Sequence, residues 1–232
     1  LPGYLIEAKL ILNLGAVREG ERIIYNDLPW QVKSINFYTK LVNPLLECGT
    51  LLVPLKELTG HISRKFDSDE PWFPTRTEDF VLLDDGKYGQ VIKQTPESVL
   101  LKAMGAIKAY RTTGFLDLNP QNLSIQGFTL MMTFGLDYQH QENITTTIRE
   151  TLEKELHEAM GQAELSQQLT KLSVEFKQAG ASSLDLVVIT SFNGDAAASY
   201  FPIQRLLQRL AVEACNRHDW IIPFNQITVH KA

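Results

Sequence analysis

The sequence has few cysteines and no long hydrophobic run. These absences argue against a disulfide-stabilised protein and against a membrane-spanning helix within the sequence. The 232 residues contain only Cys48 and Cys215, which lie far apart and lack the spacing of a metal site. Two such thiols indicate buried apolar side chains in a reducing compartment rather than a disulfide. No stretch reaches the roughly 20 apolar residues that a membrane-spanning helix requires. We therefore expect the chain to fold around an ordinary hydrophobic core, which its 44% hydrophobic residues can supply.

An excess of positive charge is also missing. The chain has 22 Lys and Arg residues against 27 Asp and Glu residues, which gives a net charge of −5 at pH 7. This balance argues against a dedicated surface for nucleic acid or for an anionic membrane. The most basic stretch is residues 102–111, and the expected inner strands offer Phe176 and Phe192 without the interleaved basic residues that single-strand binding needs. Nucleic acid is therefore not an expected partner.

Complete catalytic, nucleotide-binding and metal-binding motifs are absent as well. The glycine-rich phosphate-binding patterns GxxxxGK[ST] and GxGxxG do not occur. Three other motifs begin, but each lacks a required residue. They are His157-Glu158, where Gly161 replaces the second histidine of HExxH; His140 and Glu142, an HxE without a CxxC; and residues 67–69 (DSD), where Trp72 replaces the glycine of a calcium loop. We therefore predict that the chain has no catalytic, cofactor-binding or metal-binding residue and that it is not an enzyme.

A weak internal repeat occupies the first half of the chain. Residues 21–35 (ERIIYNDLPWQVKSI) and residues 79–93 (DFVLLDDGKYGQVIK) each contain a short apolar strand, a turn rich in Asn and Asp, and a second strand with Gln-Val. Such turns between strand-like runs predict two β-hairpins. Each copy continues into a further strand-like segment and ends in an apolar run that meets a proline. The continuing segments are residues 37–42 and 98–101, and the final runs are residues 51–54 and 115–120.

This repeat predicts two tandem small β-barrels of the SH3-like or Sm-like kind, over residues 19–58 and 77–124. We expect their cores to include Ile23, Val32, Val53, Val81, Val91 and Leu118. Gly89 is expected where the backbone of the second barrel bends or approaches a neighbouring strand. Between the two copies, the charged and proline-bearing residues 67–74 (DSDEPWFP) predict a linker or a long loop.

The pattern changes after Gly127, where strands and helices alternate. Residues 128–134 predict a strand, and residues 144–160 predict a helix that Asn143 caps. Two strands (residues 171–176 and 184–192), a helix from Pro202 and a last strand (residues 226–230) follow. The order β-α-β-β-α-β is that of a ferredoxin-like domain. The predicted class is α+β, with an N-terminal segment and first β-domain (1–66), a linker and second, inserted β-domain (67–125) and an α/β domain (126–232).

Several short motifs in the second half occur together in one known family. They are the strand 128–134 followed by GLDY (135–138), the segment FKQAGASS (176–183) before an apolar strand, NGD (193–195), and PFNQI (223–227). On these residues the chain resembles the cytoplasmic part of the small-conductance mechanosensitive channel (MscS) family. The β-domain pattern of that family is partly met in the first half. It is met by Gly20-Glu21, Val32 and Val53-Pro54 in the first copy, and by Asp79, Gly89-Gln90-Val91 and Leu118-Asn119-Pro120 in the second.

The resemblance implies a non-catalytic role without cofactors. Relatives form a seven-fold ring below a pore in the cell inner membrane, and this part lies on the cytoplasmic side as a vestibule. The vestibule holds the pore helices together and filters the ions and osmolytes that leave when the pore opens under membrane tension. The pore-lining helix itself would lie upstream of residue 1. A physical reason also favours assembly, because neighbouring subunits can cover the open sheet edges of small barrels, and residues 226–230 are a natural candidate.

Two other classes of function stay open on the sequence alone. One is a freestanding soluble module that binds nucleic acid or protein through its small barrels. The other is an enzyme whose site is not visible from residue spacing. An upstream coding sequence with apolar segments of about 20 residues would support the channel interpretation.

Overall fold

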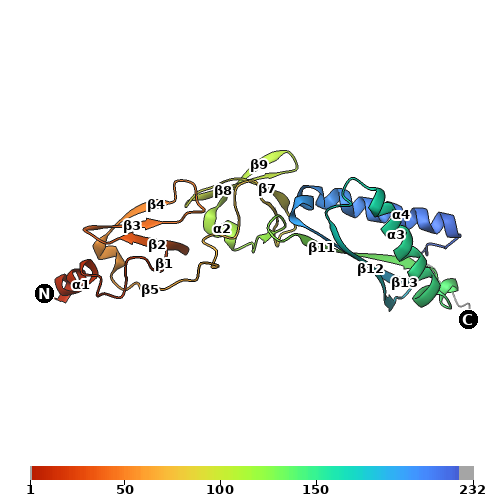
Figure 1. Cartoon of the computed structure of the whole chain (residues 1–232), viewed down its shortest axis with the longest axis horizontal. Helices are drawn as coiled ribbons and strands as arrows, with labels where there is room; N and C mark the ends of the chain where they lie inside the picture. The colour runs from red at the N-terminus through yellow and green to blue at the C-terminus, as the bar shows by residue number, and fades with distance from the viewer. Residues whose placement is uncertain (1, 225–232) are drawn as a thin grey trace, which may run out of the picture. The chain divides into compact units, whose positions relative to one another are not determined.

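The computed structural model describes residues 2–224 and confirms the α+β class. The chain divides into two compact units, one up to Asn122 and one from Leu123 onward, which are drawn in Figure 1 and described separately below. The predicted last strand, residues 226–230, lies outside the described residues. Between residues 2 and 224, no helix combines the length and the apolar character needed to cross a bilayer.

The first unit contains two five-stranded antiparallel sheets with the same strand order. After helix α1 (Pro2–Ile11), the first sheet has the order β4-β3-β2-β1-β5, and the second has the order β9-β8-β7-β6-β10. The first sheet consists of β1 (Arg22–Tyr25), β2 (Leu28–Ser34), β3 (Tyr38–Val42), β4 (Thr50–Pro54) and β5 (Ser63–Arg64), with the short helix η1 (Leu55–Leu58) before β5. The second consists of β6 (Phe80–Leu82), β7 (Tyr88–Gln94), β8 (Ser98–Ala103), β9 (Ala106–Arg111) and β10 (Gln121–Asn122), with α2 (Thr112–Leu116) before β10.

The internal repeat is confirmed at the level of single hydrogen bonds. The Val32 amide donates to the Glu21 carbonyl at 2.9 Å, and the matching Val91 amide donates to the Asp79 carbonyl at 2.8 Å. A register shift follows each of these two valines, in the β2–β3 ladder and in the β7–β8 ladder. Both valines are fully buried. The Gln-Val pairs of the sequence therefore occupy equivalent positions in the two sheets.

Turn chemistry explains the hairpins. Asn26 and Asp27, between β1 and β2, both have positive φ angles (50° and 61°), the combination that a tight two-residue hairpin turn requires. Gly86 (φ 78°) serves the turn between β6 and β7. A further hairpin turn at Met104 and Gly105, with φ angles of 50° and 83°, joins β8 to β9.

The end of the second repeat differs from the prediction. Residues 115–120 were expected to match strand β4, but Phe115 lies in helix α2 and β9 takes the place of the strand. The reason is burial: almost every side chain of β9 is exposed, so this strand has no apolar run by which the sequence could reveal it. Phe115 is instead fully buried as a core residue on a short helix.

Closed barrels are not confirmed. Among the described residues no ladder joins β4 to β5 or β9 to β10, so both sheets are open. Their core is nevertheless where the sequence predicted it. Ile23, Val32, Val53, Val81 and Val91 are all buried, and Leu118 is partly buried against the same cluster.

The second unit has one three-stranded antiparallel sheet and two long helices. Its sheet has the order β11-β13-β12, the split arrangement expected from the sequence. Its elements are β11 (Phe128–Leu136), η2 (Tyr138–His140), η3 (Ile144–Ile148), α3 (Arg149–Gln162), β12 (Leu169–Ala179), β13 (Leu184–Phe192), η4 (Gly194–Ser199) and α4 (Tyr200–His218). Asn143 stands before η3 as predicted, but its side chain makes no capping hydrogen bond.

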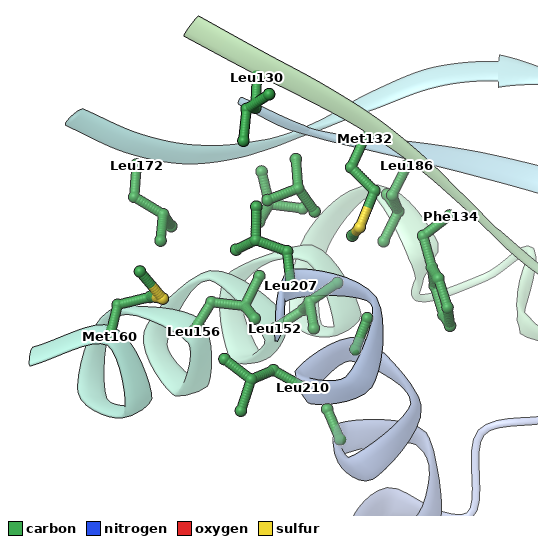
Figure 2. Close-up of a cluster of buried hydrophobic side chains, with 14 of the residues drawn as sticks. Leu130, Met132, Phe134, Leu152, Leu156, Met160, Leu172, Leu186, Leu207 and Leu210 are labelled. Carbon is green, nitrogen blue, oxygen red and sulfur yellow. The ribbon is translucent and has the colours of Figure 1, made fainter. Parts of the chain in front are cut away.

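Helices α3 and α4 pack against one face of this sheet (Figure 2). The contact follows from periodicity, because alternate residues of β11 and every third or fourth residue of each helix are apolar. The predicted helical stripe is fully inside the core, and it consists of Ile144, Ile148, Leu152, Leu156 and Met160. Cys215 of α4 joins this core, where burial raises the pKa of its thiol to about 11. Cys48 is exposed, so the expectation of a buried thiol is confirmed for Cys215 and wrong for Cys48; neither forms a disulfide.

Gly89 lies at the close approach that the sequence predicted. A Cβ atom there would stand 2.6 Å from the Lys102 carbonyl oxygen and 2.9 Å from Leu101 Cγ, on the neighbouring strand β8. We expect Gly89→Val to lower the free energy of unfolding by about 1–3 kcal/mol, because backbone and core atoms must move apart. Thermal and urea unfolding measure this change.

Gly161 of α3 provides the matched control for this substitution. A Cβ atom at Gly161 would meet nothing within 4 Å, so Gly161→Ala should leave stability unchanged or raise it slightly. Equal melting temperatures for Gly89→Val and the unmodified chain would contradict the close approach in the second sheet.

Candidate functional site

None of the incomplete chemical motifs is completed in three dimensions by the described residues. Among residues 2–224, no group of three or more His, Cys, Asp and Glu side chains is arranged to hold a metal ion. The imidazole of His157 lies 3.2 Å from the Leu172 carbonyl, which is a structural contact between α3 and β12. The features that distinguish this chain are instead a clamped connection, a buried polar junction, a tight turn and open sheet edges.

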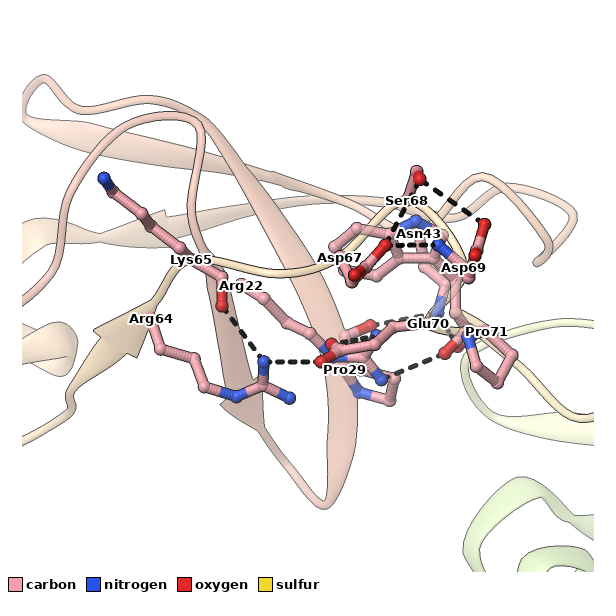
Figure 3. A network of polar contacts seen from close by, with 11 residues as sticks. Arg22, Pro29, Asn43, Arg64, Lys65, Asp67, Ser68, Asp69, Glu70 and Pro71 are labelled. Carbon is pink, nitrogen blue, oxygen red and sulfur yellow. Dashed lines mark hydrogen bonds and ion pairs between the residues drawn. The ribbon is translucent and has the colours of Figure 1, made fainter.

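The connection between the two sheets of the first unit is clamped onto the first sheet, and it is not a free linker (Figure 3). Arg22 of β1 donates to the Pro71 carbonyl at 3.0 Å, lies 3.5 Å from the Glu70 carboxylate and faces the Trp72 ring at 4.8 Å. Arg64 binds the other oxygen of Glu70 at 2.9 Å, and this hydrogen bond is the main cause that lowers the pKa of Glu70. The Arg22 guanidinium therefore contacts Glu70, Pro71 and Trp72, and these contacts hold residues 70–72 against β1.

A buried polar junction then joins the first sheet to the second. The amide group of Gln94, which ends β7 and is fully buried, donates to the Leu45 carbonyl at 2.6 Å and to the Thr75 carbonyl at 2.8 Å. It also accepts from the Thr75 hydroxyl at 2.7 Å. The Gln94 carbonyl accepts from the Glu47 amide at 2.8 Å. Because each of these polar groups has its partner, the junction fixes the loop between β3 and β4 against the end of β7.

Asn43 does the same for the end of the connection. Its side-chain amide donates to the Trp72 carbonyl at 2.8 Å and to the Pro29 carbonyl at 2.9 Å, so it ties Trp72 to the first sheet. Figure 3 shows Asn43 beside Pro29 and the connection. Sequence reasoning missed these contacts, since they link residues up to 49 positions apart through side-chain-to-backbone hydrogen bonds.

The GASS motif forms the tight turn between β12 and β13. The Gly180 amide donates to the Ser183 carbonyl at 2.7 Å, and the Ser183 hydroxyl donates to the nearly buried Asp185 carboxylate at 2.7 Å. Tyr138, just after β11, donates its hydroxyl to the Gly180 carbonyl at 2.6 Å. A Cβ atom at Gly135 would stand 2.9 Å from Ser183 Cβ, so small residues are needed on both sides. The motif therefore packs a turn against β11.

Each of the three sheets ends in a strand whose outer edge has no strand partner within residues 2–224. The long edge strands are β4 and β9 in the first unit and β11 and β12 in the second. Of these, β4, β9 and β11 each carry one strongly exposed apolar side chain: Leu52 (67% exposed), Ile107 (63%) and Met131 (70%). Beside β11 and helix α4 lies a groove of about 520 Å³, lined by Leu130, Met132, Leu207 and Arg205 among others. An open edge with an exposed apolar residue is the form of surface to which another strand adds.

The comparison with known proteins finds similar folds among solved structures. No protein-family model and no curated protein matches the sequence. Among solved structures, the fold is similar to Helicobacter pylori MscS in its closed state, with a TM-score of 0.52 and 16% sequence identity. The similarity covers 68% of this chain and 60% of that protein. A cryo-EM structure of Arabidopsis thaliana MSL1 is also similar over 66% of this chain and 54% of its own, with a TM-score of 0.45 and 13% identity.

The similarity to Helicobacter pylori MscS confirms the resemblance seen in the sequence as a likeness of fold. Over about two thirds of its length, the chain has the fold seen in an MscS channel. It covers at most three fifths of the length of these two channels.

The buried junction gives a second prediction. Replacing Gln94 by Leu keeps the size of the side chain but leaves two carbonyls and one hydroxyl without their partner. We expect Gln94→Leu to lower the free energy of unfolding by about 2–4 kcal/mol, because each buried unsatisfied group costs about 1–3 kcal/mol. Gln90→Leu, on the same strand, is the control: Gln90 makes one exposed hydrogen bond at 3.2 Å and should matter little. Similar losses in both variants would contradict the role of the junction.

The clamp predicts that Glu70→Ala frees the connection between the sheets. Arg22 and Arg64 lose their shared carboxylate, so trypsin should cleave after Arg64 and Lys65 about three to ten times faster than in the unmodified chain. Asp69→Ala is the control, because the Asp69 carboxylate contacts the neighbouring Ser68 hydroxyl rather than either arginine. Unchanged cleavage in Glu70→Ala would show that the ion pairs do not hold the segment.

Proposed function

We propose that this chain is the cytoplasmic vestibule portion of an MscS-like mechanosensitive channel, a non-catalytic module that assembles below the pore and filters the ions and osmolytes that leave under membrane tension. The observation that carries the proposal is the likeness of fold to Helicobacter pylori MscS over 68% of the chain. The whole protein would be a cell (inner) membrane protein, anchored by a segment upstream of residue 1, with this part on the cytoplasmic side.

Within this proposal the chain has three parts. Residues 1–66 and 67–125 form two SH3-like β-domains, of which the second is an insertion, and residues 126–232 form a ferredoxin-like domain. The shared strand order of the first two sheets supports the first part of this division. The clamp at Arg22 and the junction at Gln94 support a stiff collar, because both β-domains are then held by specific polar contacts.

Assembly into a ring of identical subunits, seven by family resemblance, follows from the open edges. A ring lets one surface of each subunit cover the corresponding edge of the next, so no edge is left in water. The exposed Leu52, Ile107 and Met131 would then be buried between subunits. Residues 226–230 are the proposed closing strand.

Light scattering and sedimentation of the purified chain test this proposal. We expect concentration-dependent self-association in the micromolar range, and weaker association when the chain is cut after Phe224. Ile107→Lys and Met131→Lys should each weaken association about tenfold, which corresponds to about 1.4 kcal/mol. Ile24→Lys is the control, since Ile24 is similarly exposed (55%) but lies on the inner strand β1.

A chain that stays monomeric at all concentrations, with no effect of the cut after Phe224, would overturn the vestibule proposal. A freestanding binding module for protein or nucleic acid would then be the better explanation of the two small β-domains. The coding sequence upstream of Leu1 gives an independent check, because the proposal requires apolar segments of about 20 residues there.

A further inference from the structure

The chain that leaves helix α4 is held at one residue, Ile221, by contacts to the segment that follows β11. The Ile221 amide donates to Nε2 of His140 at 2.8 Å, and the Ile221 carbonyl accepts from the Asp137 amide at 2.9 Å. Asp219 (φ 56°) ends the helix, and the Trp220 ring stacks on His218 at 4.8 Å. Both backbone groups of Ile221 are thus bound, and one of them is bound by a titratable side chain.

The hydrogen-bond geometry assigns a tautomer to the neutral ring of His140. Two N–H donors approach the same ring nitrogen: the Ile221 amide at 2.8 Å and the Gln139 side-chain amide at 3.4 Å. A ring nitrogen that accepts a hydrogen bond must carry a free lone pair, so the proton of the neutral ring sits on Nδ1. Histidine is also the side chain whose ordinary titration falls between pH 5 and pH 8.

We propose that His140 is a proton-operated latch for residues 220–224. When Nε2 takes a proton from solvent, its lone pair is used, and an N–H group then faces the Ile221 N–H group. The hydrogen bond between the Ile221 amide and His140 is then lost. Of the two backbone bonds of Ile221, only the one from the Asp137 amide to the Ile221 carbonyl stays. The inference stands on contacts within the second unit and does not depend on the proposed channel function.

Charged and titratable side chains lie near His140 on both segments. On its own side, His140 has Asp137, whose carboxylate accepts from the Gln139 amide, and Glu142 two residues further on. On the facing segment stand Asp219 and His218.

One layer further, Glu155 of α3 binds both Arg217 and His218. The hydrogen bond from Arg217, followed by the contact with His218, lowers the pKa of Glu155, so this carboxylate stays ionised when histidines gain protons. Protonation of His218 keeps its bond to Glu155, whereas protonation of His140 removes its bond to Ile221. Mild acid should therefore loosen the hold on Ile221, which keeps only its bond to the Asp137 amide, while α4 stays attached to α3.

Nuclear magnetic resonance of the ¹⁵N-labelled chain tests the latch directly. At pH 8 we expect a through-hydrogen-bond ¹⁵N–¹⁵N coupling between the Ile221 amide and His140 Nε2, and at pH 5 we expect this coupling to be absent. At pH 5 the Ile221 amide should also exchange with solvent about three to ten times faster than in His140→Gln at the same pH, which is the protection that one hydrogen bond gives. The glutamine oxygen reaches as far as Nε2 and accepts at every pH.

Two more variants separate the latch from a general effect of acid. His140→Leu has no acceptor at this position. Its Ile221 amide should be poorly protected, relative to the intrinsic exchange rate at each pH, at pH 8 as well as at pH 5, and its melting temperature should be unchanged. His218→Gln should keep the pH response of Ile221, because the response belongs to His140. An Ile221 amide equally protected at both pH values, or an acid response that persists in His140→Gln, would overturn the proposal.

Discussion

The edges of the open antiparallel sheets carry unpaired backbone N–H and C=O groups, and the arrangement of the strands depends on how these groups are shielded or paired. An uncovered strand edge presents a row of donors and acceptors that pair with whatever strand comes near. One side of each β-domain sheet ends in a strand of only two residues, β5 or β10, which leaves little edge to expose. The other side ends in a full strand, β4 or β9, and the sheet of the second unit ends in full strands on both sides, β11 and β12. Three of these longer edges carry a strongly exposed apolar side chain (Leu52, Ile107 and Met131), which is the kind of surface to which another strand adds.

The sequence predicted most elements, because most of them are encoded by local patterns. The Gln-Val repeat located β2 and β7, and the apolar stripe from Ile144 to Met160 located the helix below the sheet. Strand β9 was missed because its side chains face water on both sides and leave no alternation in the sequence. The clamp and the junction were missed for a different reason. Gln94 finds the Leu45 carbonyl across 49 positions, and no local pattern encodes a contact between a side chain and a distant backbone group.

The functional features were harder to predict than the fold. The GASS motif was visible in the sequence, and its small residues are explained by the close approach of Gly135 to Ser183. The HxE pattern at His140 was not interpreted as a metal motif, because no CxxC accompanies it. Its histidine nonetheless has a specific contact, which the sequence could not show, because the partner is the backbone amide of Ile221, 81 residues away. A backbone group looks the same in every residue, so this kind of contact leaves no compositional trace.

The buried polar groups at Gln94 explain why two β-domains behave as one compact unit. An apolar contact between the sheets would tolerate sliding, since apolar surfaces attract without direction. Three hydrogen bonds from one buried amide group tolerate only one arrangement, because any slip leaves Leu45 and Thr75 with unpaired groups away from water. A buried polar contact of this kind adds less stability than specificity. Such specificity would matter in the proposed ring of subunits, because an angular error within one subunit would be repeated at every position around it.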